Sequence, residues 1–149
     1  MSEHSEKNCI FCNIAQGKAP CYMIGEDDLS FAILDINPFS RGHCLVLPKR
    51  HVRWWHELTE AENTSLFSMA KKVADRMMKV LNPDFVCIYA RGRRIPPPTH
   101  IFLVPTHSGD VLDKFFNALQ MFQESPPMLT ALRESRTLKE VAEKLKASY

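Results

Sequence analysis

Glycine is scarce in this chain, with five residues in 149, and these form neither a G-x-G-x-x-G fingerprint nor a Walker phosphate loop. This argues against doubly wound dinucleotide folds and P-loop enzymes, which depend on such loops. Long apolar runs are also missing, since no stretch approaches the roughly 20 residues that a membrane-spanning helix needs. Residues 1–7 are polar, and no apolar segment of a secretion signal follows them. We therefore expect a cytoplasmic protein without a membrane partner.

An excess of charge of one sign is equally absent. The 19 basic and 17 acidic residues leave a formal net charge of +2, and the tight basic cluster is limited to Arg91, Arg93 and Arg94. A nucleic-acid-binding domain carries a broader basic face, so we expect no nucleic acid partner. With 45% hydrophobic and 24% charged residues, the chain has the composition of one globular domain that folds without disulfides.

The five cysteines are an odd number in a chain without a secretion signal, which favours free thiols or metal ligands over a disulfide framework. Cys9 and Cys12 are three residues apart, a spacing at which two sulfurs on one turn can reach the same zinc ion. The same spacing also suits two small buried apolar side chains, and no second Cys-x-x-Cys completes a zinc ribbon. A zinc site would need further ligands from histidines elsewhere in the chain.

Hydrophobic periodicity predicts an α+β fold. A short helix carries both cysteines and ends near Gly17, and a long helix follows a capping box of Thr59 and Glu62. The expected strands are 29–35, 44–47, 85–89 and 101–104, the last closed by Pro105. Two strands, a long helix and two more strands form a meander and not a series of parallel βαβ units.

We expect three segments along the chain. Residues 1–7 form a disordered tail and residues 8–110 the main domain. Residues 111–149 form a mostly helical C-terminal extension packed on that domain, because helix-start signals at 125–127 and 137–140 accompany apolar positions at helical spacing. Residues 110–123 also have a helical period, although a strand is an alternative for so short a segment.

Four polar side chains stand at the ends of apolar strands. Asp35 follows one strand, and an acid in that position needs partners. His43 begins the next strand, where a buried imidazole bonded to backbone is expected, and His51 follows that strand at a position suited to a metal ligand. His100 opens the last strand after three prolines. Taken alone, His100 fits a satisfied structural histidine better than a ligand or a nucleophile.

Read together, four sequence blocks resemble the zinc-containing branch of the histidine-triad (HIT) family. They are residues 8–12 (NCIFC), 31–38 (FAILDINP), 41–51 (RGHCLVLPKRH) and 100–105 (HIFLVP), which occur in the family's order. The resemblance covers residues 8 to about 110. It implies a homodimer in which each subunit packs a strongly bent antiparallel sheet against a long helix.

The resemblance also implies a purine nucleotide, such as AMP, at the end of the sheet. Phe31, Ile33 and Ile36 would wall the purine, with plain core packing as their alternative role, and Asp35 would accept hydrogen bonds from the ribose hydroxyls. In family members the middle of three alternating histidines attacks the α-phosphate, and water resolves the nucleotidyl-histidine.

The same likeness implies a structural zinc ion bound by Cys9, Cys12 and His51, without an organic cofactor. The triad motif itself is eroded. Anchored on Val104-Pro105, it places His100 at the nucleophilic position, with Pro98 and Phe102 where the flanking histidines belong. Counted forward from Gly92 instead, His100 becomes the first triad histidine, which is the fourth zinc ligand in this branch. The Gly-Gln-Ser segment that precedes the triad is also missing.

The resulting hypothesis is a purine nucleotide-binding hydrolase of nucleoside phosphoramidates or other nucleotidyl conjugates, with His100 as nucleophile and with turnover impaired by the lost histidines. The alternative is a catalytically inactive protein that keeps zinc and the purine pocket and acts as a nucleotide- or partner-binding module. A homodimer is expected through residues 60–90, where the apolar set is broader than one helix face needs: Leu66, Phe67, Met69, Ala70 and Val73.

Overall fold

The computed structural model of this chain describes residues 9–90, 98–124 and 127–148. It divides into two compact units, residues 1–110 and residues 111–149. The expected disordered tail, 1–7, and the arginine cluster at 91–94 lie outside the described residues. No helix in the described ranges is long and apolar enough to cross a membrane.

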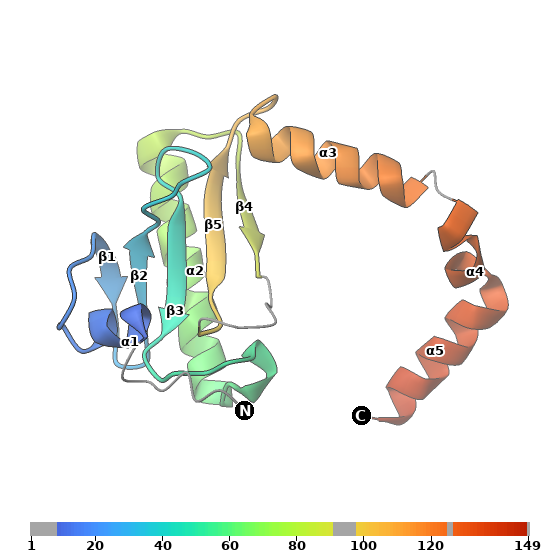
Figure 1. Cartoon of the computed structure of the whole chain (residues 1–149), viewed down its shortest axis with the longest axis horizontal. Coiled ribbons are helices and arrows are strands. Elements are labelled where there is room, and N and C mark those ends of the chain that lie inside the picture. The colour runs from blue at the N-terminus through green and yellow to red at the C-terminus, as the bar shows by residue number, and fades with distance from the viewer. Residues whose placement is uncertain (1–8, 91–97, 125–126, 149) are drawn as a thin grey trace. The chain divides into compact units, whose positions relative to one another are not determined.

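The first unit is an α+β domain (Figure 1). Its elements are α1 (Ile10–Ala15), β1 (Met23–Glu26), β2 (Ser30–Leu34), β3 (Cys44–Pro48), the 3₁₀ turn η2 (Trp55–Glu57), α2 (Glu60–Leu81), β4 (Phe85–Tyr89) and β5 (Ile101–Thr106). The strands form one antiparallel sheet in the order β1-β2-β3-β5-β4. The predicted architecture, an antiparallel sheet packed on a long helix, is confirmed.

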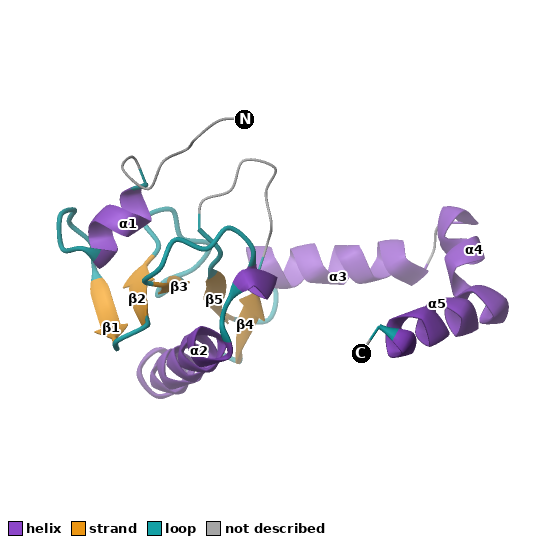
Figure 2. Ribbon diagram, turned by 90° about the horizontal axis from the view of Figure 1, so that it is seen from below, coloured by secondary structure: helices purple, strands orange, loops and turns teal. Residues whose placement is uncertain are grey.

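Helices cover both faces of this sheet, with α1 and α2 on opposite sides (Figure 2). On the α2 side, Ala32, Val46 and Leu103 pack into a buried cluster with side chains of that helix. On the other side, Phe31 and Leu45 belong to a second cluster, to which α1 contributes. Because successive side chains of a strand point to opposite faces and both faces are buried, these strands show continuous apolar runs in the sequence.

Helix α2 begins and ends where the sequence predicts. The Thr59 hydroxyl accepts the Glu62 N–H at 3.2 Å, and the Glu62 carboxylate accepts the Thr59 N–H at 2.8 Å. At the other end Asn82 adopts a left-handed conformation, with φ 51°, and Pro83 follows. This conformation terminates helices because it turns the chain away from the helix axis.

Two strand predictions need correction. Strand β1 was not expected, because Met-Ile-Gly-Glu shows no alternation of apolar and polar residues. In the structure, its pairing with β2 shifts register between Met23 and Gly25, as in the bulges that glycine often marks. Strand β5 does not end before Pro105. The β3–β5 pairing stops at Leu103 while the β4–β5 pairing continues, so a proline at position 105 needs no partner on the β3 side.

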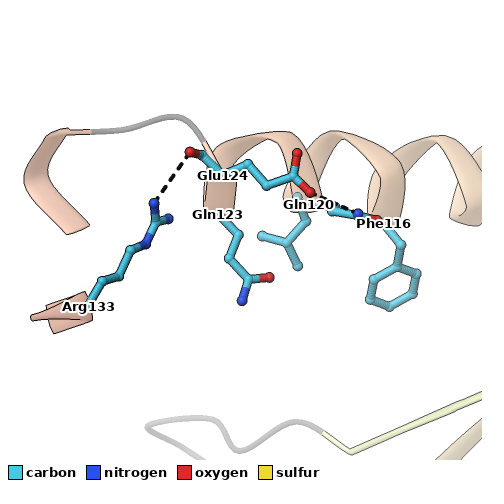
Figure 3. Close-up of a pocket in the computed structure, with 6 residues that line it drawn as sticks. Phe116, Gln120, Gln123, Glu124 and Arg133 are labelled. Carbon is cyan, nitrogen blue, oxygen red and sulfur yellow. Dashed lines mark hydrogen bonds between the residues drawn. The ribbon is translucent and has the colours of Figure 1, made fainter. Parts of the chain in front are cut away.

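The second unit is helical and contains α3 (Val111–Glu124), the 3₁₀ turn η3 (Pro127–Leu129), α4 (Thr130–Arg133) and α5 (Ser135–Ala147). Residues 111–124 are thus a helix and not a strand. The last helix begins at Ser135, two residues before the expected start, and part of the 125–127 signal lies outside the described residues. Arg133 donates to the Glu124 carbonyl oxygen at 3.3 Å and so ties α4 to the end of α3 (Figure 3).

Candidate functional site

Three predicted zinc ligands come together at one edge of the first unit. The ligand atoms of Cys9, Cys12 and His51 all lie within 4.8 Å of one another, and Cys12 Sγ is 3.1 Å from His51 Nδ1. Cys9 is the N-cap of α1, and its sulfur accepts the Cys12 N–H at 3.4 Å. Two thiols and one imidazole nitrogen are a donor set that zinc prefers, so these residues fit the metal that the sequence predicts.

Hydrogen bonds hold the segment around His51 from two sides. Arg50 forms a bidentate pair with Glu62, at 2.6 and 2.7 Å, which fixes the chain leaving β3 to the first turn of α2. Val52 accepts the Thr99 N–H at 2.6 Å. The cysteine and histidine cluster is therefore connected both to α2 and to the residue just before His100.

A cleft of about 450 Å³ lies between α1 and the sheet. Ile33, Leu45 and Phe102 contribute to its lining and are directly paired across β2, β3 and β5, so they form one row of side chains on this face. Phe11, which lies between the two cysteines, also lines the cleft. Its ring centroid is 6.0 Å from that of His100. The metal-ligand cluster and the cleft thus share a wall.

His100 lines this cleft and has a defined ring tautomer. Its Nδ1 lies 2.9 Å from the Pro98 carbonyl oxygen, which can only accept, so Nδ1 carries the proton. In the neutral ring Nε2 then holds the lone pair. The Phe102 ring packs against His100 with centroids 4.5 Å apart. His100 is not among the described residues whose ligand atoms gather around Cys9, Cys12 and His51.

Asp35 lies at the Ile36 and Asn37 end of the cleft. One carboxylate oxygen accepts the Asn37 N–H at 2.8 Å. The other is 3.6 Å from Nε2 of the buried His43. His43 Nδ1 accepts the Phe39 N–H at 3.1 Å, which confirms the expected backbone-bonded imidazole. Burial lowers the pKa of His43, with the nearby His100 adding to the effect and the Asp35 charge opposing it, so the ring is kept neutral.

The remaining predicted site residues take different places. Ile33 and Ile36 line the cleft together with Asp35. Phe31 does not line it; its side chain is 1% exposed and packs in the cluster beneath. In α2, Phe67 is exposed, whereas four residues of the apolar set pack into the domain's own core: Leu66, Met69, Ala70 and Val73.

Several cleft residues were not predicted as pocket residues from the sequence. Leu45 lies in the unbroken apolar run of β3, which gives no sign of which side chains face the cleft. Phe11 adjoins the cysteines and entered the sequence analysis only as part of the block at residues 8–12. Cys21 and Tyr22 precede β1, the strand that was itself missed. For Phe11, the spacing of the two cysteines could have indicated a wall residue on the same turn.

A second hollow, of about 630 Å³, lies within the helical unit. Gln120 donates to the Glu124 carboxylate at 3.0 Å along one side of it (Figure 3). Its described lining offers no cysteine or histidine and combines glutamine side chains with Phe116 and Leu119. Glu124 and Arg133 complete this lining.

Comparisons with known proteins identify the family of this chain. The sequence profile of the HIT domain matches residues 16–94. Adenosine 5′-monophosphoramidase hnt1 of Schizosaccharomyces pombe is 37% identical over 67% of this chain and 70% of its own length. Adenylylsulfatase HINT3 of Arabidopsis thaliana is 30% identical over 72% of this chain, which spans only 56% of that protein.

Solved structures show the same fold. A HIT family protein from Bacillus anthracis aligns with a TM-score of 0.78 at 25% identity, covering 95% of this chain and 97% of that one. A zinc-bound histidine triad family protein from Mycobacterium smegmatis aligns with a TM-score of 0.66 at 30% identity, covering 72% and 81%. With a profile match over more than half of its length and relatives of this identity, the chain belongs to the histidine-triad (HIT) family.

Proposed function

We propose that this protein binds a purine nucleotide such as AMP in the cleft beside α1 and hydrolyses adenosine nucleotidyl conjugates through a covalent intermediate on His100. The observation that carries the proposal is the position of His100 in a cleft that also holds Asp35, with its Nδ1 proton directed at the Pro98 carbonyl. The names of the two relatives, a monophosphoramidase and an adenylylsulfatase, support hydrolysis of adenosine conjugates as the reaction class.

The ring tautomer suits nucleophilic attack. With the proton on Nδ1, the Nε2 lone pair of His100 can attack the α-phosphorus while the bond from phosphorus to the conjugated group breaks and its electron pair leaves with that group. The Pro98 carbonyl stabilises the imidazolium that forms. Water then attacks the same phosphorus and loses a proton, and the electron pair of the bond between phosphorus and His100 returns to Nε2. The products are AMP and the released group.

In this proposal the nucleotide is held by residues on β2, on β3 and in the turn after β2. Ile33 and Leu45 present apolar surface to the purine, Ile36 closes its outer side, and Phe31 supports Ile33 from within the core. The Asp35 carboxylate accepts the ribose hydroxyls, since the Asn37 N–H and His43 hold it at the cleft wall. A carboxylate with two fixed neighbours needs little reorganisation when it binds.

Cys9, Cys12 and His51 would hold zinc. When bound, the ion would act as a structural staple between α1 and the chain leaving β3, with Phe11 kept against His100. With these three residues as the protein ligands, His100 would serve as the nucleophile and not as a ligand. The zinc-bound relative from Mycobacterium smegmatis supports this assignment.

A second candidate function is a nucleotide-binding module without turnover. It is favoured by Pro98 and Phe102, which stand where the family has histidines and cannot transfer protons.

We also propose a homodimer through α2 and β4. A cytoplasmic location is consistent with cysteines that are all free, as expected in a reducing compartment.

Calorimetry of AMP binding, together with turnover of adenosine 5′-phosphoramidate and adenylyl sulfate, tests this proposal. We expect Asp35→Ala to weaken AMP binding, whereas Asp28→Ala, a change at an exposed acid outside the cleft, leaves it unchanged. His100→Ala should abolish turnover while AMP still binds. Native turnover in His100→Ala would contradict the role of His100, and unchanged affinity in Asp35→Ala would contradict the pocket.

A further inference from the structure

We infer that a groove on the α2 side of the sheet binds a small amphiphile that combines one carboxylate with a straight alkyl tail of medium length, such as decanoate. The groove has a volume of about 340 Å³ and is lined by residues of α2, β1, β2 and β3, and its volume is typical of small-molecule sites. It is separate from the cleft beside α1. Cys44 lines the groove and its neighbour Leu45 lines the cleft, and successive strand residues point to opposite faces. The site is therefore independent of the proposed nucleotide function.

The floor of the groove is apolar and uncharged. It consists of three buried side chains, Val73 and Met77 on α2 and Cys44 on β3. The Cys44 thiol donates to the Gly42 carbonyl oxygen at 3.3 Å, and burial raises its pKa to about 11. At neutral pH the thiol is therefore protonated and already has a hydrogen-bond partner. Such a floor suits an alkyl chain and not a metal ion or a charged group.

The walls of the groove are aliphatic. Ile24, Leu34 and Leu81 are half-buried, and Val80 at the mouth is 78% exposed. These side chains offer apolar surface to a flexible chain, whereas the described lining includes no aromatic ring on which a base could stack. A stable protein interface takes about 20–30 residues a side, and ten described residues line this groove. A small ligand therefore fits it better than a protein partner.

Two arginines supply the charge that selects an anion. Arg41 precedes β3 and Arg76 lies on α2, and both contribute to the lining. Neither forms an ion pair within the described ranges of the chain. Arg76 donates to the Ile24 carbonyl oxygen at 3.1 Å, which holds its guanidinium beside β1 and leaves further N–H groups for a ligand. Guanidinium groups match the geometry of a carboxylate.

The orientation of the ligand follows from these positions. Arg41 and Arg76 are exposed, whereas Val73, Met77 and Cys44 are buried. The carboxylate therefore lies at the mouth, where it keeps part of its hydration and avoids the cost of burying a charge. The alkyl tail runs inwards along the aliphatic walls to the floor.

Calorimetric titration of the full-length chain with decanoate, below its micelle concentration, tests this inference. Each buried methylene is worth about fourfold in affinity, so we expect decanoate to bind at least about tenfold more tightly than the shorter hexanoate. Decyltrimethylammonium carries the same tail with the opposite charge. It should bind at least about tenfold more weakly than decanoate, because it cannot accept the arginine hydrogen bonds.

Variants at exposed positions locate the site without disturbing the core. Arg41→Gln and Arg76→Gln should each weaken decanoate binding by about fivefold or more, because each removes a charge-assisted hydrogen bond. Arg53→Gln, at an exposed arginine outside the groove, should leave it unchanged. Val80→Glu adds a negative charge at the mouth and should weaken binding by about tenfold. Its control is Met78→Glu, at an exposed position of the same helix outside the lining.

Binding that depends on tail length, survives saturating AMP and is reduced only in the groove variants supports the inference. No measurable decanoate binding would overturn it, as would equal affinity for decanoate and decyltrimethylammonium. Displacement of decanoate by AMP would place the ligand in the cleft beside α1. Binding to phosphatidylglycerol vesicles without binding of free decanoate would assign the arginines to a membrane surface. Either of these last two results would also overturn the inference.

Discussion

Two imidazoles on the cleft face of the sheet are held in opposite tautomers by backbone groups. A carbonyl oxygen takes the Nδ1 proton of His100, whereas a peptide N–H donates to Nδ1 of His43. His100 therefore offers a lone pair at Nε2, and the neutral His43 offers an N–H. That N–H has no hydrogen-bond partner within the described part of the chain, although it lies near the Asp35 carboxylate. Backbone geometry thus leaves one ring with an Nε2 lone pair, as the proposed attack requires, and directs the N–H of the other towards the carboxylate.

At the same scale, we predict that Cys12→Ala removes the metal. Cys12 is buried and lies close to both other ligands, so its loss leaves two ligands for a tetrahedral ion. Elemental analysis of protein purified without added metal should give close to one zinc per native chain and sharply less for the variant. Unfolding should also require less denaturant, because zinc binding is coupled to folding.

Cys87→Ala is the matched control for this experiment. Cys87 is a half-buried thiol on β4 whose pKa is raised by burial, and it has no part in the ligand cluster. It should keep full zinc content. Native protein that contains no zinc would refute the metal site.

The candidate site was predictable from single residues only in part. The structure brings together Cys9, Cys12 and His51 as predicted, because short motifs at strand and helix ends can be recognised in the sequence. The role of Phe31 was less accessible, since Phe31 and Ile33 lie on the same face and only their depth differs. Depth depends on what α1 covers, which is a tertiary property.

Among the elements, the junction between β3 and α2 combines a capping box with an ion pair. Glu62 forms the capping box with Thr59 and also pairs with Arg50. These contacts lower the pKa of Glu62 from 4.5 to about 2, with the Arg50 hydrogen bond as the largest cause. The stabilisation is therefore present above about pH 4.5 and is lost as the pH falls towards 2. His51 directly follows Arg50, so this junction also positions one of the proposed zinc ligands.

We predict that Glu62→Gln lowers the free energy of unfolding by about 1–2 kcal/mol at pH 7, because it removes a charge-assisted pair. Urea denaturation at pH 7 and pH 3 measures the effect, and the difference from the native chain should shrink at the lower pH. Glu60→Gln, at an exposed position of the same helical turn, should cost at most a few tenths of a kcal/mol. A loss that is equal at both pH values would refute the electrostatic account.

The turn between β2 and β3 depends on Gly42. Its φ is +93°, and a Cβ there would collide with Cδ1 of Leu81 near the end of α2. Gly17 also has a positive φ, +70°, but a Cβ there would meet no atom within 4 Å. The pair therefore separates backbone strain from the packing of the turn against the helix.

Gly17→Ala should cost about 1–2 kcal/mol through its left-handed backbone. We predict that Gly42→Ala costs about 1–3 kcal/mol more, because the added methyl also overpacks the contact with Leu81. Thermal and urea unfolding of the two variants would test this. Equal losses would show that Leu81 moves aside without penalty.

How well the elements could be predicted depended on the strength of their local signals. Helix α2 has a capping box, a long apolar period and an Asn-Pro end, and all three match the structure. Strand β1 has none of these signals, and it pairs only because β2 offers it a neighbour. The sequence analysis placed a strand end before Pro105. Whether a proline ends a strand depends on which neighbouring strands pair with it at that position, and the arrangement of the sheet decides this, not the local sequence.

Side chains of β4 and α2 leave an apolar surface on the first unit. β4 is an outer strand of the sheet. Ile88 on it is 53% exposed and points to the same face as Val86, which packs towards α2. Phe67 on α2 is exposed as well. The other α2 residues that the sequence suggested for an interface are buried in the core. Two subunits would therefore have to pair through these exposed side chains and through the edge of β4. Open strand edges favour pairing with another strand.

We therefore predict a homodimer at micromolar concentration, measured by sedimentation velocity. Ile88→Arg should shift the protein toward monomer, because it places a charge on the exposed face of the outer strand and would desolvate it in any interface. Trp55→Arg is the control: Trp55 is 63% exposed but lies in η2, outside the proposed interface, so this variant should remain a dimer. AMP binding should persist in both variants, since neither residue lines the cleft, and this checks that they are folded. A native chain that sediments as a clean monomer would contradict the assembly, and a dimer unaffected by Ile88→Arg would move the interface away from β4.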